Sequence, residues 1–232
     1  MNSKAAQLDT IDALMAGYVS GSLPYPIHIL MASHLEIMGD SQKLAATLEG
    51  LAGEALNNIE PLNMDPANLA DSKNAPQDKL SQIFASHPKD AILLNSQKPP
   101  ITNQKCAIMP NALQAFTGFT ADTIPWRTKM PGFKEYHLEN MADCEATLFW
   151  IRPGRAIPDH THEGSEFTLV LDGGFSDTTG HYDRGSISVA DSSIDHRPVA
   201  DDDVPCIGFA VTTGQLKLTG SYGRILGDIL GA

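Results

Sequence analysis

The sequence has few basic side chains and no long apolar segment. Its 232 residues include 16 Lys and Arg against 28 Asp and Glu, so the formal net charge is −12 at pH 7. A surface of that sign repels phosphates, which argues against direct binding to nucleic acid. No stretch approaches the roughly 20 apolar residues that a membrane-spanning helix needs, and residues 1–12 lack the basic start and apolar core of a secretion signal. We therefore expect a cytoplasmic protein without membrane contact.

Cysteine is also scarce, whereas the rest of the composition is ordinary. The three cysteines, Cys106, Cys144 and Cys206, are far apart, odd in number and without the spacing of a metal motif. In a reducing compartment we expect thiols that are mostly buried. Hydrophobic residues make up 42% of the chain and charged residues 19%, which excludes a disordered or fibrous protein. The length accommodates one large domain or two small ones.

Apolar residues recur at helical spacing in the first part of the chain. The pattern predicts helices over residues 8–19, 27–38, 44–59 and, as a short fourth one, 78–86. Two stretches rich in polar residues and proline, 57–77 and 95–104, read as loops or linkers. Helices this short are not stable alone, so they must share a core. We therefore predict a helical domain over residues 1–97.

From about residue 107 the pattern changes to short β-rich segments separated by Gly or Pro. The clearest of them lie over residues 145–151, 166–171, 186–189 and 206–212. Several short strands at this spacing are typical of a sandwich or barrel. The predicted fold class is therefore α+β with two domains, in which an all-β domain over residues 105–232 follows the helical one.

The candidate functional residues form one spaced pattern, Gly154-x5-His160-x-His162-x3-Glu166-x6-Gly173, followed by Gly185-x10-His196. Residues two apart in a strand point to the same side, so His160 and His162 present two imidazoles to one point. Glu166 begins the next apolar strand, and His196 comes from a later strand. Three nitrogens and one oxygen suit one divalent ion such as Zn, Fe, Mn, Ni or Co. The ligand types alone do not choose among these metals, and Zn is our first guess. The alternative is that the paired histidines are surface residues of a hairpin.

This pattern resembles the two motifs of the cupin superfamily. The first motif matches at each diagnostic glycine, histidine and glutamate. In the second motif Gly185 and His196 are in place, and Asp191 replaces a frequent turn proline that is not a ligand. The resemblance implies a jelly-roll barrel, or double-stranded β-helix, with its metal inside.

The surrounding segments narrow the resemblance to the ChrR-type anti-sigma factors. In the β-rich part they are Trp126-Arg127, Arg155-Ala156-Ile157-Pro158, Thr168-Leu169-Val170-Leu171, Phe175-Ser176-Asp177, Ala190-Asp191, His196-Arg197-Pro198-Val199-Ala200 and Gly223-Arg224-Ile225-Leu226. In the helical part they are Ala16-Gly17-Tyr18, Gly21-Ser22-Leu23-Pro24 and Ala32-Ser33-His34-Leu35. The resemblance implies that the helical domain binds an extracytoplasmic-function sigma factor. It also implies that the cupin domain is required for the response to singlet oxygen or related oxidants.

One departure concerns a second metal that the resemblance implies. In the family, zinc in the helical domain is held by an early histidine and by His-x3-Cys-x2-Cys. Here His34 is present, but Met38 and Ser41 occupy the cysteine positions, and the early histidine falls near Asp9. Neither a thioether nor a hydroxyl replaces a thiolate at structural zinc. We therefore expect no zinc in this domain, with His34 and Met38 packed in its core.

Two functions stay open from the sequence. The first is regulation by an anti-sigma factor that meets its partner through apolar anchors on the first two helices, roughly residues 8–38. The second is a metal-dependent cupin enzyme such as a dioxygenase, although the sequence contains no separate acid, base or nucleophile motif. We favour regulation because the resemblance covers nearly the whole chain. The expected partners are a sigma factor and a small molecule at the metal, and a homodimer is compatible with the sequence.

Overall fold

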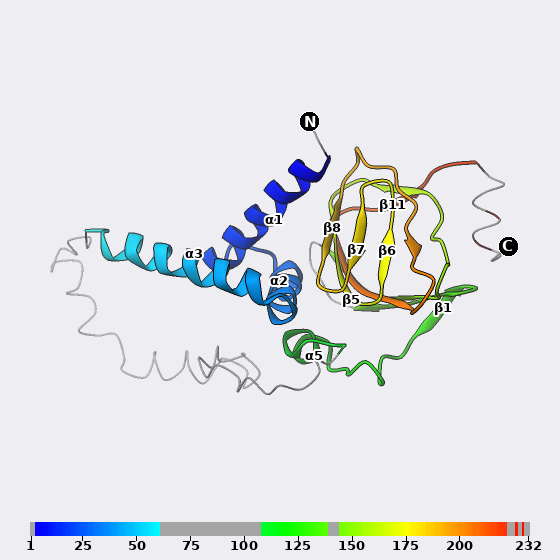
Figure 1. Ribbon diagram of the computed structural model, residues 1–232, viewed down its shortest axis with the longest axis horizontal. Coiled ribbons are helices and arrows are strands. Elements are labelled where there is room, and N and C mark those ends of the chain that lie inside the picture. The colour runs from blue at the N-terminus through cyan, green and yellow to red at the C-terminus, as the bar shows by residue number, and fades with distance from the viewer. Residues whose placement is uncertain (1–2, 61–107, 139–143, 222–225, 227–228, 230–232) are drawn as a thin grey trace, which may run out of the picture. The chain divides into compact units, whose positions relative to one another are not determined.

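The computed structural model describes residues 3–60, 108–138, 144–221, 226 and 229 (Figure 1). The chain divides into two compact units, one formed by Met1–Gly53 with Cys106–Ala232 and the other by Glu54–Lys105. The helix predicted over residues 78–86 and the linker over 95–104 lie outside the described residues. Both predicted domain boundaries, at 97 and 105, lie there as well.

Three helices form the first part of the chain, as the apolar periodicity predicts. They are α1 (Ser3–Ser20), α2 (Tyr25–Ile37) and α3 (Gly39–Asn57). Gly21 has a φ of +69°, a conformation that glycine adopts without steric strain, and it ends α1. Pro26 stands in the first turn of α2, where a missing N–H breaks no helical hydrogen bond. Met38 is extended and so separates α2 from α3.

A short helix that the sequence analysis did not predict, α5 (Asn111–Thr117), precedes the strands. Glu36 of α2 accepts hydrogen bonds of 2.7 Å from the backbone N–H groups of Asn111 and Ala112. The N–H groups of a first turn have no partner inside their own helix, so this carboxylate caps α5. The cap also attaches α5 to α2.

Antiparallel strands make up the rest of the described chain. They are β1 (Arg127–Met130), β2 (Phe133–Leu138), β3 (Glu145–Ile151), β4 (His160–His162), β5 (Glu166–Asp172), β6 (Gly174–Ser176), β7 (His181–Asp183), β8 (Ile187–Ala190), β9 (Val199–Ala200), β10 (Cys206–Thr212) and β11 (Leu216–Leu218). The largest sheet has the order β1-β2-β3-β10-β5-β8, and smaller sheets have the orders β7-β6-β9 and β11-β4. Figure 1 shows the strands wrapped around a common interior, in agreement with the predicted all-β barrel.

The large sheet separates two hydrophobic cores. Leu148 of β3 and Phe209 of β10 belong to the core that also contains Leu30 of α2. Phe149 and Ile151, which alternate with Leu148 along β3, belong to the core inside the barrel. This alternation follows from the period of two in a strand. The helices therefore cover one face of the sheet, and the other face lines the interior where the predicted ligands lie.

Candidate metal centre

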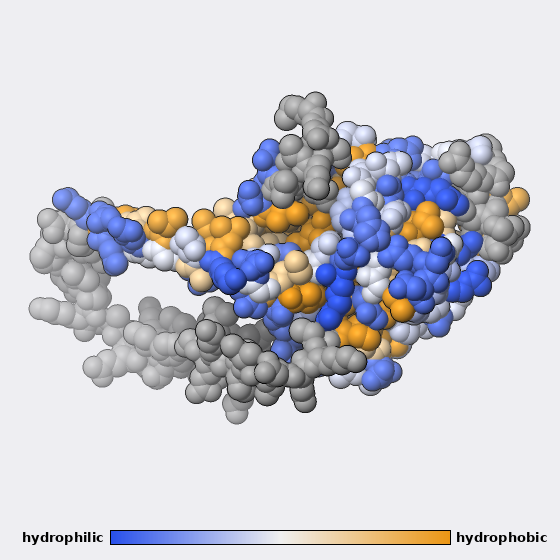
Figure 2. Space-filling model, viewed as in Figure 1, coloured by the Kyte–Doolittle hydropathy of each residue, from blue (hydrophilic) through white to orange (hydrophobic). Residues whose placement is uncertain are grey.

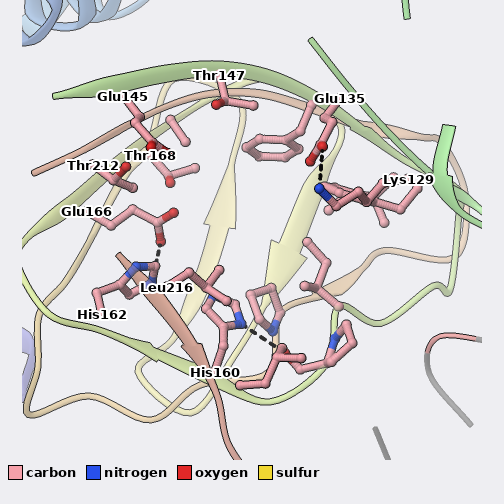
Figure 3. Close-up of a pocket in the computed structure, with 18 of the residues that line it drawn as sticks. Lys129, Glu135, Glu145, Thr147, His160, His162, Glu166, Thr168, Thr212 and Leu216 are labelled. Carbon is pink, nitrogen blue, oxygen red and sulfur yellow. Dashed lines mark hydrogen bonds and ion pairs between the residues drawn. The ribbon is translucent and has the colours of Figure 1, made fainter. Parts of the chain in front are cut away.

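The four predicted ligands meet inside the barrel, and Figure 3 shows three of them beside a cavity. His160 and His162 come from β4, and Glu166 is the first residue of β5. His196 lies before β9 and exchanges two backbone hydrogen bonds of 3.0 Å with His160. The sequence analysis placed His196 in a strand, whereas the structure places it in this isolated bridge. The three histidines are at most 4% exposed.

The side chains converge on one another. The Oε2 atom of Glu166 lies 3.3 Å from Nε2 of His162 and 3.8 Å from Nε2 of His196. The two Nε2 atoms are 3.3 Å apart. One ligand atom from each of the four residues lies within 4.8 Å of the others. Imidazole nitrogen and carboxylate oxygen are common ligands of divalent transition metals, so the residues fit such an ion.

Hydrogen-bond acceptors beside the Nδ1 atoms of His160 and His196 determine which nitrogen of each imidazole carries the proton. Nδ1 of His160 donates a 2.8 Å hydrogen bond to the carbonyl of Pro158, and Nδ1 of His196 donates one of 2.9 Å to Asp177. Because each Nδ1 carries the proton, each Nε2 keeps its lone pair for an ion. The side chain of Asp177 is fully buried and accepts further hydrogen bonds from the N–H groups of Thr179 and Gly180.

The sequence analysis did not identify Asp177 as a functional residue. Its carboxylate is 19 positions away from His196 along the chain, and only the turn after β6 brings the two together. The one available signal was its place in the segment Phe175-Ser176-Asp177, which the family resemblance contained. Nothing in the spacing from His196 predicted the contact.

Burial and neighbouring charges place the ligands in their metal-binding forms. Burial lowers the pKa of His160 to about 4, and the charge of His196 adds to this effect. Burial alone raises the pKa of Glu166, but the hydrogen bond with His162 and the charges of all three histidines lower it overall. A neutral imidazole and an ionised carboxylate are the forms that bind a metal.

A cavity of about 490 Å³ opens beside these residues (Figure 3). Thr212 of β10 stands between Glu145 and Glu166 in the register of the sheet, so the end of the cavity near the ligands is polar. The other walls are largely apolar and include Met130, Phe133, Phe149, Ile151, Ile157 and Phe175. The cavity thus has a polar end at the predicted ligands and a largely apolar body that also contains the Lys129–Glu135 ion pair.

The helical residues do not fit a zinc ion. His34 is buried, as predicted, but its Nδ1 lies 2.8 Å from the carbonyl of Gly185 and its Nε2 lies 2.8 Å from Oγ of Ser41. Both ring nitrogens are therefore occupied by hydrogen bonds. Met38 is 38% exposed rather than buried in a core, because it lies in the extended link after α2. Asp9 is exposed on α1.

The remaining predictions concern the thiols and the membrane. Cys206 is a buried free thiol, and burial raises its pKa to about 12, which disfavours the nucleophilic thiolate. Cys144 is partly exposed, and Cys106 lies outside the described residues.

Within the described ranges, no helix has the length and apolar character required to span a bilayer.

The barrel and its set of three histidines and one glutamate define the chain as a cupin. Residues 115–217 match the family model described as the ChrR cupin-like domain. The chain is 31% identical over 206 residues to the anti-sigma-E factor ChrR of Cereibacter sphaeroides, which covers 89% of each chain. This protein belongs to the ChrR family, as the sequence resemblance predicted.

A solved structure gives the same result for the fold. The crystal structure of Rhodobacter sphaeroides SigE in complex with the anti-sigma ChrR matches with a TM-score of 0.64 and 28% identity. The match covers 87% of this chain and 96% of that chain. The likeness therefore extends over the helical part as well as the barrel.

Proposed function

We propose that this chain is an anti-sigma factor whose helical region binds an extracytoplasmic-function sigma factor and whose cupin domain receives a chemical signal. The observation that carries the proposal is the structural match to ChrR from its complex with SigE, which includes both regions. The sequence relation to the anti-sigma-E factor over 89% of each chain supports it independently. Because sigma factors act in the cytoplasm, this function places the chain there.

An exposed apolar stripe on α3 is the surface that we assign to the partner. Leu44 and Leu51 are 43% and 57% exposed, and Leu48 lies between them on the same face of the helix. Figure 2 shows apolar side chains open to solvent along this helix. The anchors expected on α2 are mostly buried, Leu30 and Met31 completely. A helix that presents apolar positions i, i+4 and i+7 suits docking into a groove of the partner.

Binding of the full chain to the sigma factor encoded beside it tests this function. Replacing Leu44→Asp and Leu51→Asp together is expected to weaken binding at least about tenfold, since two apolar anchors become charged. Ala46→Asp is the matched control, because Ala46 is exposed on the opposite face of α3. Wild-type affinity of the double variant would exclude α3 as the surface. Failure of the unaltered chain to bind would reject the anti-sigma function.

The metal in this function is one divalent transition ion held by His160, His162, Glu166 and His196. The donor set of three nitrogens and one oxygen suits zinc, which we name first, and equally iron, manganese or nickel. When bound, an ion that takes more than four ligands would keep a position open for an oxygen donor. Elemental analysis of the purified protein identifies it. An unchanged metal content after His160→Ala and His162→Ala would show that these residues are not the ligands.

The cavity indicates which signal molecules suit the cupin domain. Lys129 is paired with Glu135 at 3.0 Å, and the lining also contains the carboxylates of Glu145 and Glu166. This lining therefore disfavours phosphorylated or multiply charged anions. Its apolar walls favour a neutral, mainly apolar molecule with one oxygen group directed at the metal residues.

A metal-dependent cupin enzyme, such as a dioxygenase, is the second candidate function. It is favoured by one observation, the cavity of about 490 Å³ directly beside the metal residues. Oxygen uptake by the metal-loaded protein with small diketones or phenols tests it. Turnover of such a substrate together with no binding to a sigma factor would replace the regulatory function.

A further inference from the structure

His34 is a buried link between the helices and the cupin domain. Its residue surface is only 6% exposed. Nδ1 lies 2.8 Å from the carbonyl oxygen of Gly185, in the turn between β7 and β8, and Nε2 lies 2.8 Å from Oγ of Ser41 on α3. A carbonyl oxygen only accepts, so Nδ1 carries the proton and Nε2 accepts from the Ser41 hydroxyl. One neutral imidazole thus joins α2, α3 and the barrel.

The turn at Gly185 is itself attached to the strand that carries a metal residue. The N–H of Gly185 donates a 2.8 Å hydrogen bond to the carbonyl of Val170, and the N–H of Val170 donates one of 3.1 Å to Ser186. Val170 belongs to β5, which begins at Glu166. β8, which follows the turn, pairs with β5 so that Ala190 lies opposite Glu166. Two routes of backbone pairing therefore connect His34 with Glu166.

Close packing makes this link stiff. Gly185 has a φ of +88°, and a Cβ atom there would lie 2.6 Å from Sδ of Met38 and 2.9 Å from a methyl carbon of Ile37. Only glycine gives the turn both this conformation and this approach to the end of α2. A displacement of the turn is therefore transmitted to α2 and α3 rather than absorbed by empty space.

We propose that His34 is a positioning residue that couples the cupin metal site to the helices. When β5 becomes more ordered around Glu166, the change is transmitted to His34 of α2 through its hydrogen bond with the Gly185 carbonyl. It is then transmitted to α3 through the hydrogen bond between His34 and Ser41. One consequence rests on the proposed function: the affinity of the helices for the sigma factor would depend on whether the cupin site holds a metal. The coupling between the two regions of the chain is itself independent of a partner.

Hydrogen exchange of the full chain, followed by mass spectrometry with and without added Zn²⁺, tests the coupling. In the unaltered chain, Zn²⁺ is expected to slow exchange at least about fivefold in α2 and α3 as well as in β4 and β5. In His34→Leu the slowing is confined to β4 and β5. His28→Leu is the matched control, because His28 also lies on α2 but stacks on Tyr18. In this control we expect the unaltered pattern.

Two further results separate a structural defect from lost coupling. Ser41→Ala leaves the hydrogen bond between His34 and Gly185 intact. In this variant we expect Zn²⁺ to slow amide exchange in α2 but no longer in α3. Equal slowing of α2 and α3 in the unaltered chain and in His34→Leu would overturn the proposal, as would no response of these helices to Zn²⁺ in the unaltered chain. Absence of any binding to a sigma factor would reject the proposed function alone, because the exchange experiment contains no partner.

Discussion

A buried carboxylate outside the set of proposed ligands orients one of them. Asp177 accepts a hydrogen bond from Nδ1 of His196 at 2.9 Å, and its side chain is fully buried. Burial alone raises the pKa of Asp177, but the hydrogen bonds from His196 and Thr179 lower it overall, so the carboxylate is ionised. It therefore favours the tautomer of His196 that leaves Nε2 free.

Replacing Asp177→Ala is expected to weaken metal binding about 10-fold to 100-fold, because the imidazole of His196 loses the group that fixes its tautomer and orientation. Asp177→Asn keeps an acceptor and should lose less. Competition with a chromogenic chelator measures the affinity. Asp122→Ala, at an exposed position that belongs to no candidate metal-binding cluster among the described residues, is the control. Equal affinities of the Ala variant and the unaltered chain would contradict a role for this contact.

We expect His160 to make the stability of the metal-free protein sensitive to acid. Its pKa is about 4 in the folded protein, against 6.5 for an ordinary histidine. The unfolded chain takes up the proton first, so the free energy of unfolding is expected to fall as the pH decreases from about 6.5 to about 4. This pKa shift corresponds to a decrease of up to about 3 kcal/mol in the free energy of unfolding. Urea unfolding across this range measures it, and a His160→Gln variant with the same pH dependence would show that another group is responsible.

At the scale of elements, α5 depends on a contact from another helix. Glu36 caps it through two N–H groups, and the helix has only seven residues. Glu36→Ala is expected to lower the free energy of unfolding by about 1 kcal/mol and to speed amide exchange in α5. Glu49→Ala, at an exposed position of α3, serves for comparison. If α5 exchanges at the same rate in both variants, the cap does not stabilise it.

Most long, strongly patterned elements could be predicted from the sequence, whereas the six-residue strand β2 and most of the short elements were missed. The strands predicted over residues 145–151 and 206–212 agree with β3 and β10, and the three predicted helices are present. The helix α5 and strands of two to four residues such as β6, β9 and β11 were missed. Segments of this length contain too few apolar residues for a periodic signal, so caps and pairing partners decide their conformation.

At the scale of the whole molecule, the helices and the barrel share one core. Leu30 and Met31 of α2 are completely buried in the same cluster as Leu169 of β5 and Phe209 of β10. We expect a fragment of residues 1–60 to be clearly less helical than the same segment in the full chain, because these side chains lose their cover. Circular dichroism of the fragment measures this. Full retention of helicity would show that the helices are stable without the barrel.

The sequence alone determined the chemistry of the site and the kind of fold around it. The spacing of His160, His162 and Glu166 indicated three of the proposed ligands, because residue types and strand periodicity are local properties, and the resemblance to the second cupin motif added His196. The tertiary structure decided which groups form hydrogen bonds with those residues and with the helices. Asp177 meets His196, and His34 meets Gly185, across separations of 19 and 151 residues. Such contacts depend on how sheets and helices pack, which no local pattern records.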